Sequence, residues 1–319
     1  MRSMFERRGW SIGSSVLFGV ACLLIGSRLK TYGLDLFLAV PFITGFVGAW
    51  VDALECRRSF GECCTSALIP LGLASVLFLL LGMEGLVCIA MAAVIGVPLA
   101  ILGAGLAFLV QRHRAAPAAT LTMILLAPLA MIVGPHGPGH DIDTATTSIV
   151  INAPPRIVWS YIQSFREIGP PDNLLFRAGV AYPVATRTAG VGVGATRECI
   201  LSTGVMTERV TVWKPERQLT FEVLNTPVAM RELSPWPNLD LPHLHGFYLS
   251  KQGEFRLTPV SGDKTLLEGQ SWYQHGLAPV AYWNLWTRYI VHSVHKRVLN
   301  HIKDLAEAEA TQTQLAVRR

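Results

Sequence analysis

The chain has 319 residues, of which 51% are hydrophobic and only 15% are charged, and its formal net charge is +5. Soluble domains carry about 25% charged residues, so this composition excludes a protein that is soluble along its whole length. No basic run interleaved with aromatic residues occurs, which argues against nucleic-acid binding. Of the six cysteines, only Cys199 follows residue 144, so the C-terminal part cannot contain an internal disulfide.

The first 134 residues contain apolar stretches long enough for membrane helices, which need about 20 apolar residues, with about 17 tolerated. These stretches predict an all-α transmembrane bundle of about five helices, at 10–27, 34–51, 65–83, 85–110 and 118–134. With a cytoplasmic N-terminus, seven Lys and Arg residues in short loops fall on the cytoplasmic side and two on the other. This predicts a multi-pass protein of a bacterial inner membrane with a periplasmic C-terminal domain. If the short span 118–134, which contains Pro128, does not cross, that domain is cytoplasmic.

After residue 134 the pattern changes to that of a water-soluble α+β domain. A Gly- and Pro-rich linker is expected at 135–146, a domain at 147–308 and a flexible tail at 309–319. Within the domain we expect a strand at 147–152 followed by a short helix, then an irregular stretch at 165–194. The remaining elements are strands at 195–202, 204–213, 217–225, 246–258 and 264–273, with a Pro-rich loop at 226–245, and a long helix at 279–308. The apolar stripe of that helix is Val280, Trp283, Trp286 or Thr287, Ile290, Val294, Val298, Ile302 and Leu305.

Several segments of this chain resemble a known superfamily. The segment SIVINAPPRIVWSYI resembles the opening of the SRPBCC superfamily, which has the START and polyketide-cyclase-like helix-grip fold. A bacterial membrane-anchored subgroup is resembled by further segments of the C-terminal part, namely GVGATRECILSTG, RELSPWP with LPHLHGF, LEGQSWYQHGLAPVAYWNLW and HSVHKRVLNHIKDLAE. In the apolar half, MEGLVCIAMA and PFITGFVGAW resemble the same subgroup. The resemblance implies a curved antiparallel sheet around a long C-terminal helix, with lipids, sterols, polyketides or other apolar molecules bound between them. It implies no particular reaction, although a minority of the superfamily are cyclases, dehydratases or hydrolases.

Glu208 and Arg197 are the polar candidates for a ligand site. Side chains alternate along a strand, so in 204–213 Met206, Glu208, Val210 and Val212 should face the core, and Thr207, Arg209, Thr211 and Trp213 should face outward. Arg197 shares a strand face with Cys199 and is the expected partner of Glu208. The pair would recognise a polar group of a ligand, or Glu208 would act as a general acid or base. The alternative is a structural ion pair.

Apolar candidates for ligand contact are large side chains on the helices and strands of the domain: Trp159, Phe221, Trp272, Trp283, Trp286 and Ile290. Their alternative role is core packing. Trp236 lies in the Pro-rich loop at 226–245, where it would form a lid at the membrane interface or pack against the domain itself. Glu84, between two apolar stretches, is either a solvated or capping carboxylate or a functional acid.

Three loop histidines, His243, His245 and His275, are weak candidates for a metal site, and no spacing of a known metal motif supports them. Hydrogen bonding or solvation is the alternative for these residues. His292, His295 and His301 fall on the long helix and are expected to be ordinary core or surface residues. The sequence predicts no metal and no cofactor.

The leading functional hypothesis is a membrane-anchored protein that binds a hydrophobic ligand, such as a lipid or isoprenoid, for transfer, sensing or presentation. The first alternative is an accessory subunit of a membrane protein complex. The second is a cyclase, dehydratase or hydrolase acting on a membrane-soluble substrate. An enzymatic function therefore ranks below binding. Expected partners are the lipid bilayer, an apolar small molecule, and either a membrane-protein partner or a second copy of the chain.

Overall fold

The computed structural model describes residues 12–13, 15–18, 20–21, 33–54, 57–113, 142–171, 173–237, 239, 241 and 244–317. The chain forms two compact units. The first contains residues up to Gly137 together with Glu232–His243 and Leu277–Val280, and the second contains the remaining residues from Pro138 onward.

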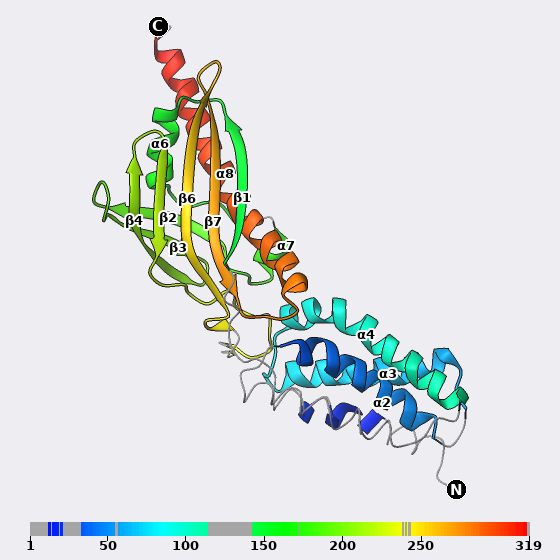
Figure 1. Cartoon of the computed structure of the whole chain (residues 1–319). Coiled ribbons are helices and arrows are strands. Elements are labelled where there is room, and N and C mark those ends of the chain that lie inside the picture. The colour runs from blue at the N-terminus through cyan, green and yellow to red at the C-terminus, as the bar shows by residue number, and fades with distance from the viewer. Residues whose placement is uncertain are drawn as a thin grey trace. The chain divides into compact units, whose positions relative to one another are not determined.

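The first unit is helical (Figure 1). A π-helical turn, η1 (Asp35–Ala39), leads into α2 (Val40–Asp52), which is followed by α3 (Phe60–Leu80) and α4 (Leu86–His113). Among the described residues, α3 and α4 are the two helices long and apolar enough to cross a membrane, and Leu36–Asp52 is a shorter apolar helix. The prediction of about five spans is therefore supported for two of them, near 65–83 and 85–110. The predicted spans 10–27 and 118–134 lie mostly or wholly outside the described residues.

Close helix packing in this unit depends on glycine. A Cβ atom at Gly45 in α2 would collide with the backbone of Ala100 in α4, and one at Gly103 would collide with the backbone of Phe42. Small residues allow the backbones of neighbouring helices to approach, which is how helices associate where both are surrounded by apolar groups. Gly45 and Gly103 therefore allow α2 and α4 to pack closely.

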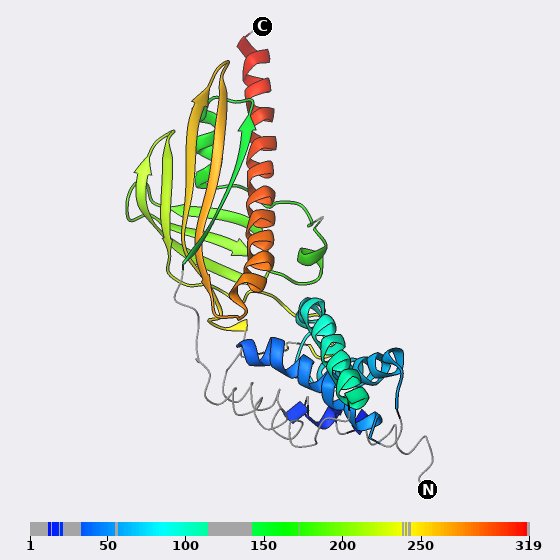
Figure 2. The same cartoon turned by 45° about the vertical axis from the view of Figure 1, so that its right-hand side comes forward.

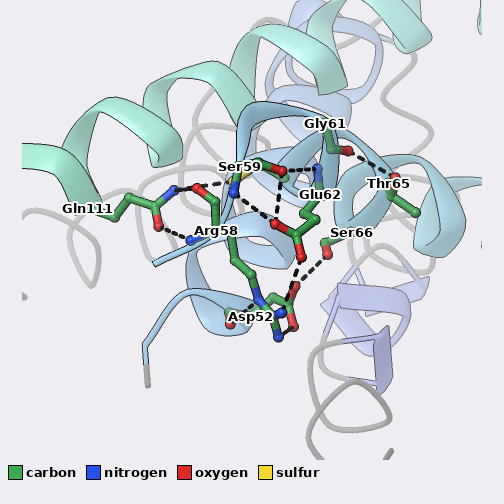
Figure 3. A network of polar contacts seen from close by, with 9 residues as sticks. Asp52, Arg58, Ser59, Gly61, Glu62, Thr65, Ser66 and Gln111 are labelled. Carbon is green, nitrogen blue, oxygen red and sulfur yellow. Dashed lines mark hydrogen bonds and ion pairs between the residues drawn. The ribbon is translucent and has the colours of Figure 1, made fainter. Parts of the chain in front are cut away.

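A polar network joins the ends of these helices (Figure 3). The buried Asp52 carboxylate, at the end of α2, accepts hydrogen bonds from Arg58 Nη2 at 3.1 Å and from Ser66 Oγ at 2.8 Å. Ser59 and Glu62 form a capping box that begins α3. The Arg58 backbone N–H donates to Gln111 Oε1 of α4 at 2.9 Å, so one residue links all three helices.

The second unit is an antiparallel sheet with a long helix along it (Figures 1 and 2). Its elements are β1 (Asp143–Ile151), α6 (Pro155–Gln163), α7 (Leu174–Arg177), β2 (Pro183–Ala189), β3 (Thr196–Leu201), β4 (Gly204–Lys214), β5 (Gln218–Val223), β6 (Tyr248–Val260), β7 (Lys264–His275) and α8 (Val280–Val317). The seven strands are ordered β1-β7-β6-β5-β4-β3-β2. This curled sheet with a long C-terminal helix fits the predicted helix-grip fold.

Two parts of the sequence prediction are wrong in this unit. The stretch 165–194, expected to be irregular, contains α7 and the edge strand β2, which begins at Pro183 because proline is tolerated at the first position of an edge strand. Helix α8 continues to Val317, so the predicted tail is largely helical. Ala310 is buried in this extension, and alanine gives little apolar signal although it is the best helix former.

The main core fills the interior between the sheet, α6 and the C-terminal half of α8. Its fully buried members include Ile151, Val158, Ile162, Leu219, Leu267, Leu299 and Ile302. The N-terminal half of α8 is less enclosed, since Trp286 and Ile290 are only half-buried and Val280 is 52% exposed. Val280 was expected in the apolar stripe but is exposed, whereas Trp283, Val291 and His295 of that half are buried.

Gly253 of β6 provides a direct test of this packing. It lies opposite Phe221 of β5, and a Cβ atom at Gly253 would collide with the Phe221 ring. We predict that Gly253→Ala lowers the free energy of unfolding by roughly 1–3 kcal/mol, the usual cost of overpacking. The measurement is denaturant unfolding of the full chain in detergent, with Gly169→Ala as the control because that site is open. Equal losses in both variants would show that the Phe221 ring is not held against β6.

Candidate functional site

A bulge in β4 decides which side chains enter the interior of the second unit. Val210 pairs with Phe221, but Val212 pairs with Thr220, so one extra residue is inserted between them. Glu208 and Val210 are buried as predicted. Beyond the bulge the alternation reverses, and Trp213 packs edge-on against Trp159 of α6 with ring centroids 5.4 Å apart. The predicted inward Val212 and outward Trp213 are therefore wrong.

The central polar feature is an ion pair between Arg197 of β3 and Glu208 of β4. The two residues are directly opposite each other in the antiparallel register. Arg197 Nη1 donates to Glu208 Oε2, and the residues are only 3% and 1% exposed. Both charges lie in the interior, where an unpaired charge would be strongly destabilising. The sequence predicted this partnership, and the structure brings the two groups together.

The guanidinium group lies on an aromatic floor formed by Phe221 and Phe255. Arg197 Cζ is 4.6 Å from the centroid of the Phe221 ring and 5.7 Å from that of Phe255. Gly253 permits this arrangement, because the Phe221 ring occupies the space of its missing side chain. A cation over an aromatic face is stabilised by the ring quadrupole. The sequence analysis missed Phe255 and Gly253, although glycine inside a strand often marks a close approach.

Burial dominates the electrostatics of this site. Burial raises the pKa of Glu208, and the attraction of Arg197 opposes that rise. Burial and the nearby Glu208 raise the pKa of Cys199 to about 12, so its thiol is not ionised at neutral pH. The buried Nε of Arg197 has no acceptor among the described residues. The arrangement can therefore donate a hydrogen bond to an oxygen atom placed against the aromatic floor.

Of the other apolar candidates, Trp159, Phe221 and Trp283 are buried, and Trp283 packs edge-on against Tyr282. Trp286 and Ile290 are half-buried on the N-terminal half of α8. Trp272 was expected to contact the ligand, and the structure contradicts this expectation. Its neighbour Tyr273 is fully buried on the face of β7 toward α8, so alternation places Trp272 on the opposite face of the sheet.

The predicted loop histidines do not assemble a metal site in the part of the chain that is described. His275 is buried at the end of β7 and hydrogen-bonds Asn284 of α8, His245 is exposed, and His243 lies outside the described residues. No group of three potential ligands occurs among the described histidines, cysteines and carboxylates.

A hydrogen-bonded chain of two hydroxyls and two histidines crosses from the sheet to α8. Ser271 Oγ lies 2.8 Å from His295 Nε2, and Thr147 Oγ1 lies 3.1 Å from His295 Nδ1 and 2.7 Å from His292 Nδ1. Burial, with a smaller effect of His292, lowers the pKa of His295 to about 4, so the ring is neutral at pH 7. These contacts are those of a satisfied core histidine.

Several solved structures resemble about half of this chain. A protein from Nitrosospira multiformis is 19% identical over 53% of this chain and 99% of its own, with a TM-score of 0.34. The protein XoxI from Bacillus cereus is 16% identical over 51% of this chain and 94% of its own, with a TM-score of 0.32. The Aha1 dimer from Colwellia psychrerythraea is 16% identical over 52% of this chain and 96% of its own, with a TM-score of 0.30. Among curated proteins, none matches this chain.

A family model gives the assignment. Residues 143–307, from the first strand through most of α8, match the model described as "Polyketide cyclase / dehydrase and lipid transport". That match covers more than half of the chain and includes the Arg197–Glu208 pair and its aromatic floor. The chain therefore belongs to the polyketide cyclase / dehydrase and lipid transport family.

Proposed function

We propose that this chain is a membrane-anchored binding protein that holds a hydrophobic ligand between the sheet and α8. The single observation that carries the proposal is the Arg197–Glu208 pair, which presents a hydrogen-bond donor within an aromatic interior. Membership of a family that includes lipid transport supports it. The apolar helices α3 and α4 support the membrane anchor, and the distribution of Lys and Arg in the loops supports a periplasmic domain of an inner-membrane protein.

The burial pattern indicates where the ligand would lie. The C-terminal half of α8 is closed by fully buried residues such as Leu299 and Ile302. On the N-terminal half, Trp286 and Ile290 remain half-buried, so a ligand there would cover apolar surface that the protein leaves partly exposed. The ligand would therefore extend from this half of α8 toward the aromatic floor.

This geometry implies an amphiphilic ligand with a long apolar part and one acceptor oxygen, such as a carboxylate or carbonyl. Burial contributes about 0.8 kcal/mol for each CH₂ group, so about ten such groups supply several kcal/mol. A hydrogen bond from a charged donor contributes about 1.5–3 kcal/mol more. These interactions hold the molecule without any bond-making step. General acid or base work by Glu208 would compete with its ion pair to Arg197, so we rank the enzymatic alternative below binding.

Native mass spectrometry of the full chain in mild detergent tests the binding proposal. We predict one co-purified apolar molecule per chain, identified by extraction. Trp286→Ala should lower its occupancy severalfold because the ligand loses a large apolar contact. Leu285→Ala is the matched control, since that neighbouring side chain is 69% exposed. A ligand-free protein, or one that retains a partner protein in place of a small molecule, would support the accessory-subunit alternative instead.

Variants of the ion pair separate stability from recognition. Arg197→Met leaves Glu208 buried without a partner and should cost about 3–5 kcal/mol of unfolding free energy. The double variant Arg197→Met with Glu208→Leu should regain most of that loss, because two apolar residues replace the pair. Glu222→Gln, in an exposed ion pair with Arg209, should change stability by less than about 1 kcal/mol.

The same double variant then tests the ligand contact. It should fold yet bind an acidic amphiphile, such as a long-chain fatty acid, at least tenfold more weakly than the unchanged protein, since it has no guanidinium donor. Binding would be followed by isothermal titration in detergent. Unchanged affinity in a folded double variant would show that the pair is purely structural.

A further inference from the structure

The loop between β5 and β6 belongs in part to the helical unit. Its residues Glu232–His243 cluster with the first unit, although β5 and β6 are strands of the second. The Leu86 N–H donates to Leu233 O at 2.9 Å, and Trp236 Nε1 donates to Leu80 O at 2.9 Å. Leu86 begins α4 and Leu80 ends α3, so these bonds satisfy backbone groups that a helix leaves unpaired at its ends.

Two glycines shape the α3–α4 turn to receive this loop. Gly82 has a φ of +65°, and a Cβ atom there would lie 3.1 Å from Trp236 Cδ1 and 3.4 Å from Leu239 Cδ1. Gly85 lies directly against the Glu232 side chain, and any Cβ atom at that position would collide with it. The docked loop therefore has a defined seat, formed by Gly82, Gly85 and the ends of α3 and α4.

Docking brings two carboxyl groups together. Burial raises the pKa of Glu232, whose side chain lies against Gly85. The Cys88 thiol and the N–H groups of Val87 and Cys88, in the first turn of α4, oppose that rise. Burial and the neighbouring Glu232 raise the pKa of Glu84, in the turn itself, to about 8. The titratable groups acting on one another here are Glu84 from the turn, Cys88 from α4 and Glu232 from the loop.

We propose that these contacts form a proton-controlled clasp, in which the β5–β6 loop is docked on the α3–α4 turn while Glu84 is protonated and is released when Glu84 and Glu232 are both charged. The clasp is a device distinct from ligand binding. Because the loop connects the strands that carry Phe221 and Phe255, its release frees the chain at one end of both strands.

The direction of the pH effect follows from linkage. In the docked state, burial and the charge of Glu232 raise the pKa of Glu84 from its ordinary 4.5 to about 8, so this state binds the proton more tightly than one in which Glu84 is exposed. The docking equilibrium is therefore strongest at low pH and weakens as pH rises between those two values. Titration of the single carboxyl group of Glu84 can lower the docking equilibrium constant by up to about tenfold per pH unit, and the effect levels off above the raised pKa of that group.

Hydrogen exchange of the full chain in lipid nanodiscs tests the clasp, with the Leu86 amide and the Trp236 indole N–H as local reporters. After correction for intrinsic exchange rates, protection of both groups should fall at least tenfold between pH 6 and pH 9. Glu84→Gln mimics the protonated group and should stay protected across that range. Glu222→Gln, far from the turn in sequence and exposed, should follow the unchanged protein. Protection that is independent of pH in the unchanged protein would overturn the proposal.

A second pair of variants tests the seat itself. Gly85→Ala should open the clasp at every pH, because its methyl group displaces Glu232, and the reporters should then exchange rapidly even at pH 6. Gly72→Ala in α3 meets no neighbour within 4 Å and should leave protection unchanged. Full protection in the Gly85→Ala variant would show that the loop is held by other contacts, and the proposal would fail independently of any result on ligand binding.

Discussion

The buried Arg197–Glu208 pair is the interaction on which the interior of the second unit depends. Two charges removed from water are tolerated only when they face each other, and the antiparallel register of β3 and β4 places them so. The guanidinium then needs a surface that accepts a cation without hydrogen bonds, and Phe221 and Phe255 provide it. That surface in turn requires the absence of a side chain at Gly253. The ion pair, the two phenylalanine rings and Gly253 therefore depend on one another.

The helical unit depends on a different constraint. Within a helix the backbone N–H and C=O groups bond to one another, so unpaired groups remain at the helix ends. At one end of the bundle the network of Asp52, Arg58 and Gln111 joins three helices. At the α3–α4 turn, backbone and side-chain groups of the β5–β6 loop complete the helix ends instead. Part of the β5–β6 loop is therefore a structural part of the helical unit.

Regular patterns in the sequence predicted much of this architecture. Length and apolar content identified α3 and α4, and strand alternation with a helical stripe identified the α+β domain and its long last helix. Alternation also paired Arg197 with Glu208. The same rule failed past Val210, because a bulge is an irregularity of pairing that leaves little trace in residue types. It also left open which face of β7 is inner, and so Trp272 was placed on the wrong side.

The sequence by itself determined the division into an apolar helical part and an α+β part, the positions of most strands along the chain, and the inward direction of Glu208. These follow from local periodicity, which each segment carries alone. Only the tertiary structure decided the aromatic floor under Arg197, the seat of Glu232 against Gly85, and the burial of Glu84. Each of those depends on segments far apart in the chain, and their proximity is set by packing and register, which no single segment encodes.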